Sequence, residues 1–136
     1  MKIKLSGEAI MPTRAHPQTL DSTSMQRKHR SYPLKNLRYL TREFTSSCRK
    51  NTVGFIKSKS GLNVNHDIVS EGVIDVGYTG SIRVKLYNHG GYDYKVNKGD
   101  KISQLVILPI LTPDLELVDE LESTERGEGG FGSTGK

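Results

Sequence analysis

The sequence predicts an all-β protein, an antiparallel sandwich or barrel within one domain. A length of 136 residues suits a single compact domain and leaves no room for a second. Fourteen glycines, an aromatic content of 7% and the absence of Trp favour many turns over a helical bundle. From Asn51 onward, short apolar runs alternate with glycine-containing turns, a pattern typical of antiparallel sandwiches and barrels.

The first expected strands lie at the N-terminus and in the middle of the chain. Residues 2–5 alternate between polar and apolar and are expected as an edge strand. Residues 52–57 form a short strand that a turn at residues 59–61 ends. Residues 72–75 lead through a glycine-rich link into residues 81–88, whose regular alternation predicts a half-buried strand. We expect the two segments to form a hairpin.

The last expected strands precede an acidic, glycine-rich tail. Residues 92–96 and 102–111 read as strands, and prolines at 109 and 113 end the second, which is the most apolar. Residues 115–121 are acidic and expected to be extended. Residues 123–136 contain five glycines and little to anchor them. We therefore predict a single β-barrel domain over residues 1–122 and a flexible C-terminal arm over residues 123–136.

Composition excludes several classes of protein. The longest apolar stretch, residues 105–111, is too short to span a bilayer, so we expect no membrane association. The first ten residues carry charges that do not fit a secretory signal. A single cysteine, Cys48, excludes an internal disulfide framework and fits the reducing cytoplasm, where we expect the protein. A net charge of +5 would also suit a nucleic-acid partner.

The positive charge is concentrated in one segment. Residues 17–50 contain eight basic residues, two acidic residues and no glycine, a net charge of +6. The rest of the chain contains 12 basic and 13 acidic residues. Apolar residues in the segment follow neither the helix nor the strand period, and Pro33 interrupts the one stretch that could be helical. The pattern therefore predicts neither a helix nor a strand there, and we treat residues 17–49 as anomalous.

The glycine-rich tail combines groups that suit a nucleotide. Its glycines allow backbone N–H groups to converge on phosphate oxygens, and Arg126 can hold a phosphate with two hydrogen bonds. Phe131 offers a face on which a base could stack. A disordered tail is the plain alternative, which composition alone would favour.

Three other places carry weaker chemical signals. Residues 59–61 offer a cation, a hydroxyl and a glycine N–H, either as a phosphate cradle or as a solvated turn. Asp75 lies beside Tyr78 in the glycine-flanked link, where a carboxylate could orient a water as general base, or where both could be ordinary turn residues. Gln104 lies among apolar neighbours and needs a partner, from a ligand or from the backbone.

Taken in order, these motifs resemble those of the trimeric dUTPase family. The segments Lys-Ser-Gly-Leu at 59–62, Gly-Val-Ile-Asp-Val-Gly-Tyr-Thr-Gly at 72–80, Gly-Asp-Lys-Ile-Ser-Gln-Leu at 99–105 and Arg-Gly-Glu-Gly-Gly-Phe-Gly-Ser-Thr-Gly at 126–135 look like its motifs two to five. The third and fifth motifs are highly specific. Residues 12–16 resemble the lead-in to the first motif. Lys59 stands where the family usually has Arg, and Ser58 where it usually has Pro.

The resemblance implies a homotrimer of β jelly-roll (β-clip) subunits that hydrolyses dUTP to dUMP and pyrophosphate. Each site would take motifs two and four from one chain, motif three from another and the tail of the third chain as a lid. Asp75 would orient the water that attacks the α-phosphorus, and Tyr78 would pack against deoxyribose. Mg²⁺ would be held mainly by the triphosphate and water, with no direct protein ligand. The implied substrate-binding residues are Lys59, Ser60, Gly61, Gly72, Ile74, Tyr78, Arg83, Gln104, Arg126, Phe131, Gly132, Ser133 and Thr134.

The family's first motif, Asp-Ala-Gly-x-Asp-Leu, is absent, and residues 17–26 stand in its place. Synonymous codons can be chosen for residues 18–26 that, read two bases later, encode Asp-Ala-Gly-Leu-Asp-Leu-Tyr-Ala. The same shift over residues 40–49 can give His-Thr-Gly-Ile-His-Ile-Glu-Leu-Pro, which is similar to the family at this point. We hypothesise that residues 17–49 are an out-of-frame translation, from a sequencing error or a genuine double frameshift. For the chain as it stands, we expect poor activity.

Three other functions compete with this interpretation. A dCTP deaminase-type relative shares the fold, although the Tyr78 segment and the tail favour dUTPase. A non-catalytic dUTPase-like protein that binds a regulatory protein partner would suit the loss of the first motif. A basic nucleic-acid module over residues 27–42 ranks last because the segment contains no recognisable motif.

Overall fold

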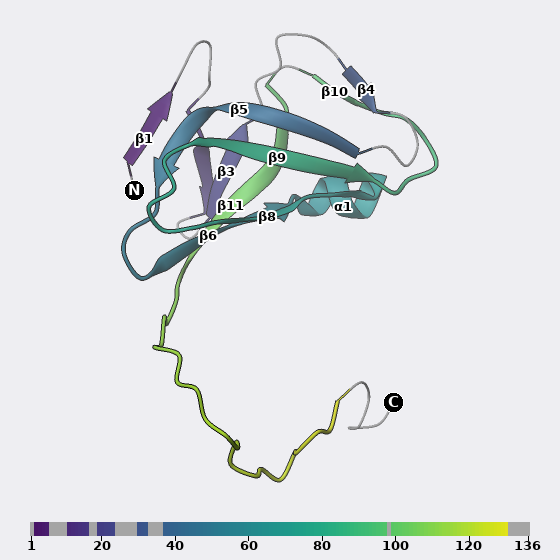
Figure 1. Ribbon diagram of the computed structural model, residues 1–136. Coiled ribbons are helices and arrows are strands. Elements are labelled where there is room, and N and C mark those ends of the chain that lie inside the picture. Colours follow the sequence, from purple (N-terminus) through teal and green to yellow (C-terminus); the bar gives the residue numbers. More distant parts are fainter. Residues whose placement is uncertain are drawn as a thin grey trace.

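The computed structural model describes residues 2–5, 11–16, 19–23, 30–32, 37–97 and 99–130 (Figure 1). Within these residues the chain forms eleven strands and one short helix, so the all-β prediction is confirmed. The helix, α1 (Ser60–His66), has only seven residues. No helix in the described ranges is long and apolar enough to cross a membrane.

Most strands belong to two antiparallel sheets. The four-stranded sheet has the order β1-β5-β9-β7, with β1 (Lys2–Leu5), β5 (Leu37–Ser47), β9 (Ser81–Asn88) and β7 (Ile68–Val69). The expected edge position of residues 2–5 is confirmed. The five-stranded sheet has the order β2-β3-β11-β6-β8, with β2 (Thr13–His16), β3 (Thr19–Thr23), β11 (Lys101–Pro109), β6 (Thr52–Ser58) and β8 (Glu71–Ile74). A separate two-stranded ladder joins β10 (Tyr94–Val96) and β4 (Arg30–Tyr32).

The hydrophobic core lies between the two sheets and draws side chains from both. Strand β9 contributes every second side chain to this core. Ile82, Val84 and Leu86 are buried, while Ser81 and Arg83 on the opposite face are exposed. This alternation confirms the half-buried strand predicted for residues 81–88. The core cluster contains Cys48, Ile56, Ile68, Ile74, Ile82, Val84, Leu86, Val96, Ile102 and Leu105.

Two expectations about the connections are wrong. The link between β8 and β9 does not close a hairpin, because β8 pairs with β6 whereas β9 pairs with β5 and β7 in the other sheet. The link therefore crosses from one sheet to the other. Residues 59–61 do not form a simple turn either, because Ser60 and Gly61 begin α1. Lys59 remains extended before the helix, and Asp67 ends it in a left-handed conformation, with φ of 52°.

The anomalous basic segment also differs from its expectation. Strands β3, β4 and β5 all lie within residues 17–49, where the sequence pattern predicts neither a helix nor a strand. Strand β3 pairs with β11, and β5 pairs with both β1 and β9. Strand formation here therefore follows from main-chain pairing with neighbouring strands, which can override a weak local pattern.

Beyond Pro109 the chain leaves the sheets. Residues 110–130 contain no helix or strand and run away from the rest of the molecule (Figure 1). Their leucines are almost fully exposed: Leu115 is 99% and Leu117 is 100% accessible. We call residues 110–130 the arm.

Candidate active site

An open pocket lies at the link between β8 and β9. It has a volume of about 280 Å³, and four predicted site residues line it: Ile74, Asp75, Tyr78 and Arg83. A fifth predicted residue, Gly72, lies on β8 two residues before Ile74. Val73, Ser81 and Ile82 also line it, and sequence reasoning named them only as parts of the 72–83 segment. The full lining is Val73, Ile74, Asp75, Tyr78, Ser81, Ile82 and Arg83.

The link holds Tyr78 in a defined place on this pocket. The Tyr78 N–H donates to the Asp75 carbonyl at 3.3 Å, and Gly77 takes a φ of +80° that other residues rarely adopt. The Tyr78 hydroxyl donates to the Ser81 carbonyl at 3.0 Å. A Cβ atom at Gly80 would lie only 2.5 Å from that hydroxyl oxygen. The Tyr78 ring therefore lies against the backbone of Gly80, where no side chain intervenes. Tyr78 is still 44% exposed, so a ligand can reach it.

Buried residues support the pocket from below. Ile74, immediately before Asp75, belongs to the core, and the Cys48 thiol donates a weak hydrogen bond to its carbonyl at 3.9 Å. Burial raises the pKa of Cys48 above its ordinary value of 9.0, so the thiol stays protonated at neutral pH. A Cβ atom at Gly54 would approach Ile74 Cβ to 3.2 Å, so the glycine permits close packing of the two strands. Sequence reasoning gave Cys48 no role, since nothing local indicates its contact with Ile74.

A second group of predicted residues gathers where β6 ends. Residues 59–61 follow β6 directly, and Gln104 on the adjacent β11 is the register partner of Lys57. The Gln104 side-chain amide donates to the Ser58 carbonyl at 3.2 Å, which is the backbone partner that the sequence left as one of two alternatives. The amide retains a second N–H and its oxygen for a ligand. Lys59, Ser60, Gly61 and Gln104 thus lie at one corner, which we call the phosphate corner.

The phosphate corner and the Asp75 pocket lie at opposite ends of β6. Strand β8 runs antiparallel to β6, with Ile74 opposite Gly54 and Glu71 opposite Lys57. Asp75 therefore lies near the start of β6, whereas Lys59 follows its last residue. The six steps along the strand from residue 53 to residue 59 span about 20 Å at roughly 3.3 Å per residue. One chain does not bring the two groups together.

Arg126, the predicted tail residue within the described part of the chain, lies away from both groups (Figure 1). Arg126 is exposed on the arm, and its Nε donates to the Gly129 carbonyl at 2.9 Å. Phe131, Gly132, Ser133 and Thr134 lie outside the described residues.

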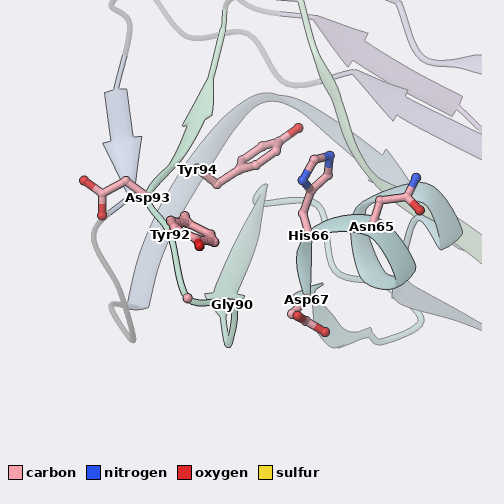
Figure 2. A pocket seen from close by; sticks show the side chains of 8 residues that line it. Asn65, His66, Asp67, Gly90, Tyr92, Asp93 and Tyr94 are labelled. Atoms are coloured by element: carbon pink, nitrogen blue, oxygen red, sulfur yellow. The ribbon is translucent and has the colours of Figure 1, made fainter.

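A further pocket, of about 260 Å³, lies at the C-terminal end of α1 (Figure 2). The rings of His66 and Tyr94 face each other with centroids 4.8 Å apart. The side chains of Asp67 and Asp93 point away from one another (Figure 2), so they do not form one acidic site. None of the predicted site residues lines this pocket. We assign its lining residues a structural role, because the contact between His66 and Tyr94 fixes the end of α1.

Comparison with known proteins identifies the family. The family model described as dUTPase matches residues 27–135. The chain therefore belongs to the dUTPase family.

Individual relatives agree with this assignment. A deoxyuridine 5'-triphosphate nucleotidohydrolase from Arabidopsis thaliana is 39% identical over 97% of this chain and 80% of its own length. The dUTPase of Staphylococcus bacteriophage 80alpha, solved with dUPNHPP, superposes with a TM-score of 0.90 at 29% identity and covers 99% of this chain and 98% of its own. A mutant dUTPase of phage phi11 of S. aureus, whose structure reveals the coordination of a structural Mg(II) ion, gives a TM-score of 0.79 at 28% identity, over 90% of this chain and 98% of its own.

Proposed function

We propose that this protein hydrolyses dUTP to dUMP and pyrophosphate, at sites that are shared between copies of the chain. Family membership supports the reaction. The observation that carries the shared site is the separation of about 20 Å between Asp75 and the phosphate corner, estimated along β6. A triphosphate with its α-phosphorus near Asp75 can reach a phosphate corner only if a second chain supplies it.

The Asp75 pocket suits the nucleoside. Tyr78 offers one face of its ring to the deoxyribose, and its fixed position would leave no room for a 2′-hydroxyl. Main-chain groups of the 72–83 segment would read the uracil edge, with Gly72, Ile74 and Arg83 as contacts. Buried donors and acceptors that pair with one base leave another base unsatisfied, which is how such a site discriminates.

The phosphate corner suits the triphosphate. Lys59 supplies a positive charge, Ser60 a hydroxyl and Gly61 a backbone N–H in the first turn of α1, where a Cβ atom on Gly61 would meet nothing within 4 Å. Gln104 adds the amide N–H that its bond to Ser58 leaves unused. These groups position and stabilise developing negative charge, which is the main way that proteins catalyse phosphoryl transfer.

Asp75 is the residue that would activate the attacking water. As a carboxylate at the pocket wall it would accept a proton from a water aimed at the α-phosphorus, and pyrophosphate would leave. Within the described residues no three His, Cys, Asp or Glu side chains gather into a metal site. This fits an Mg²⁺ ion that would be held mainly by the triphosphate and water, with no direct protein ligand. When bound, the ion would neutralise triphosphate charge.

Exposed apolar surface supports self-association. Phe55 pairs in register with Val73 on β8 and with Val106 on β11, so the three lie on one face of the five-stranded sheet. Val73 is 57% exposed on this face. The leucines of the arm are exposed as well, and exposed apolar surface of this kind is typical of interaction sites. We propose a homotrimer in which the arm crosses to a neighbouring subunit, with Arg126, Phe131, Gly132, Ser133 and Thr134 closing its site.

Mixing two inactive variants tests the shared site. Asp75→Asn removes the general base, and Gln104→Ala removes a phosphate contact. The activity of each variant homotrimer should therefore be about tenfold to a hundredfold below that of the wild type. Co-refolded mixtures form hybrid sites in which one chain supplies Asp75 and another supplies Gln104. We expect activity to reappear in the mixture. If both residues acted within one chain, no mixture would exceed the sum of its parts.

A further inference from the structure

A loop of eleven residues carries most of the phosphate corner. Residues 59–69 leave the five-stranded sheet at the end of β6, form α1 and β7, and return to it at the start of β8. Lys59, Ser60 and Gly61 lie at the departing end of this loop. Their positions therefore depend on how the two ends of the loop are held.

The far end of α1 is held by several contacts. The His66 ring packs on Tyr94 (Figure 2). The His89 N–H donates to the Asp67 carbonyl at 3.0 Å. A Cβ atom at Gly90 would lie 3.0 Å from the His66 carbonyl oxygen, so the turn after β9 lies close against this end.

The two ends of the loop meet at a pair of serines. The last ladder pair between β6 and β8 joins Lys57 and Glu71, and Ser58 and Ser70 come next. The Ser58 hydroxyl donates to the Ser70 carbonyl at 3.2 Å and accepts the Ser70 N–H at 2.9 Å. One side chain thus binds both the N–H and the carbonyl of Ser70. Because Ser70 is only 1% exposed, these two backbone groups would otherwise be buried without hydrogen-bond partners.

Ser58 also touches the phosphate corner through its main chain. Its carbonyl accepts the Gln104 amide at 3.2 Å, and Lys59 follows it directly. By contrast, the neighbouring ion pair between Lys57 and Glu71, at 2.8 Å, is exposed and should contribute little.

We propose that the Ser58 side chain is a positioning residue: it closes the 59–69 loop onto Ser70 and so aligns Lys59, Ser60 and Gln104 for a triphosphate. This inference deepens the proposed function and rests on it. It concerns a position where this chain departs from the proline that the family usually has.

The chain offers matched variants for a test. Ser58→Ala removes the two hydrogen bonds between the Ser58 hydroxyl and the Ser70 backbone, which we call the clasp. It leaves the Ser58 carbonyl that accepts the Gln104 amide. Ser58→Thr keeps a hydroxyl and should rescue. Ser70→Ala removes a buried hydroxyl oxygen that has no hydrogen-bond partner within the described structure, while it keeps the backbone groups that Ser58 binds. It is therefore a control for loss of a serine at this spot.

Two measurements decide the proposal. Hydrogen–deuterium exchange should rise over residues 59–69 in Ser58→Ala only. Binding of a non-hydrolysable imido analogue of dUTP should weaken by about fivefold to tenfold in that variant, as for the loss of one or two hydrogen bonds, and by less than about twofold in Ser58→Thr and Ser70→Ala. Unchanged exchange in Ser58→Ala would overturn the clasp, and unchanged affinity beside raised exchange would overturn its alignment role. Failure of the wild-type protein to bind the analogue would instead reject the proposed function, and the exchange result would still decide the clasp.

Discussion

At the scale of single residues, Tyr78 depends on the glycine beneath it. Its hydroxyl bonds to the Ser81 carbonyl, and its ring occupies the space that a Cβ atom at residue 80 would need. Asp75 and Tyr78 could be named from the sequence, because they fall in a short motif. The support from Cys48 and Gly54 could not, because it arises from packing between segments far apart in the chain.

Gly80→Ala should move the Tyr78 ring and relax sugar discrimination. Because the ring is partly exposed it can rotate away, so we expect the free energy of unfolding to change by less than about 1 kcal/mol. Activity on dUTP should fall about tenfold, and the preference for dUTP over UTP should fall with it. Steady-state kinetics on both nucleotides measure this effect, with Gly91→Ala as control, since a Cβ atom there meets nothing within 4 Å. An unchanged preference would show that Tyr78 does not read the sugar.

Cys48 predicts how stability depends on pH. Burial raises its pKa in the folded state above 9.0, so the folded protein holds this proton more tightly than the unfolded chain does. The resulting stabilisation is fully present below pH 9 and is lost as pH rises through the raised folded value. Urea unfolding of wild type and Cys48→Ala from pH 7 to 10 should therefore give a difference that is constant up to about pH 9 and then shrinks. A constant difference up to pH 10 would contradict the raised pKa.

At the scale of elements, regular alternation was the reliable signal. The strand at residues 81–88 follows from it, because one face is buried, and residues 2–5 also form a strand although none of them is fully buried. Pairing partners could not be predicted: the glycines of the 75–80 link allow a hairpin and a crossover between sheets equally well. The helix α1 was missed because its residues include none that are buried, so no apolar stripe marks it.

The basic segment is the element that local pattern explains least. Its strands pair in place with β9 and β11, yet residues 17–26 lack the motif that the family has there. A double frameshift remains our hypothesis for residues 17–49. The nucleotide sequence of the gene decides it, since codons that cannot encode the shifted motif would refute it.

Removal of residues 123–136 should separate folding from catalysis. The described part of this tail contains no strand and contributes nothing to the core cluster, so the unfolding free energy and the proposed trimer should persist. Activity on dUTP should fall by about a hundredfold, because the site would lose Arg126 and its cover. Thermal unfolding, sedimentation and pyrophosphate release measure the three quantities. Full activity in the truncated protein would reject the lid.

At the scale of the whole molecule, the net charge of +5 concerns mainly residues 17–50, and the remainder is close to neutral. The fold explains a nucleotide partner better than a nucleic acid, because the predicted site residues gather at a pocket and a corner rather than along a basic face. It also supports the proposed sharing of sites between chains, since β6 holds these two places apart.

Pyrophosphate release from dUTP tests the proposed hydrolysis, measured on protein whose intact mass matches this sequence and on Asp75→Asn. We expect release that is specific for dUTP over dCTP and absent in the variant. Its rate should be well below that of a dUTPase with an intact first motif. No release above the variant would contradict the enzymatic function and favour a non-catalytic binding protein. A full dUTPase rate would contradict the expected effect of the missing motif.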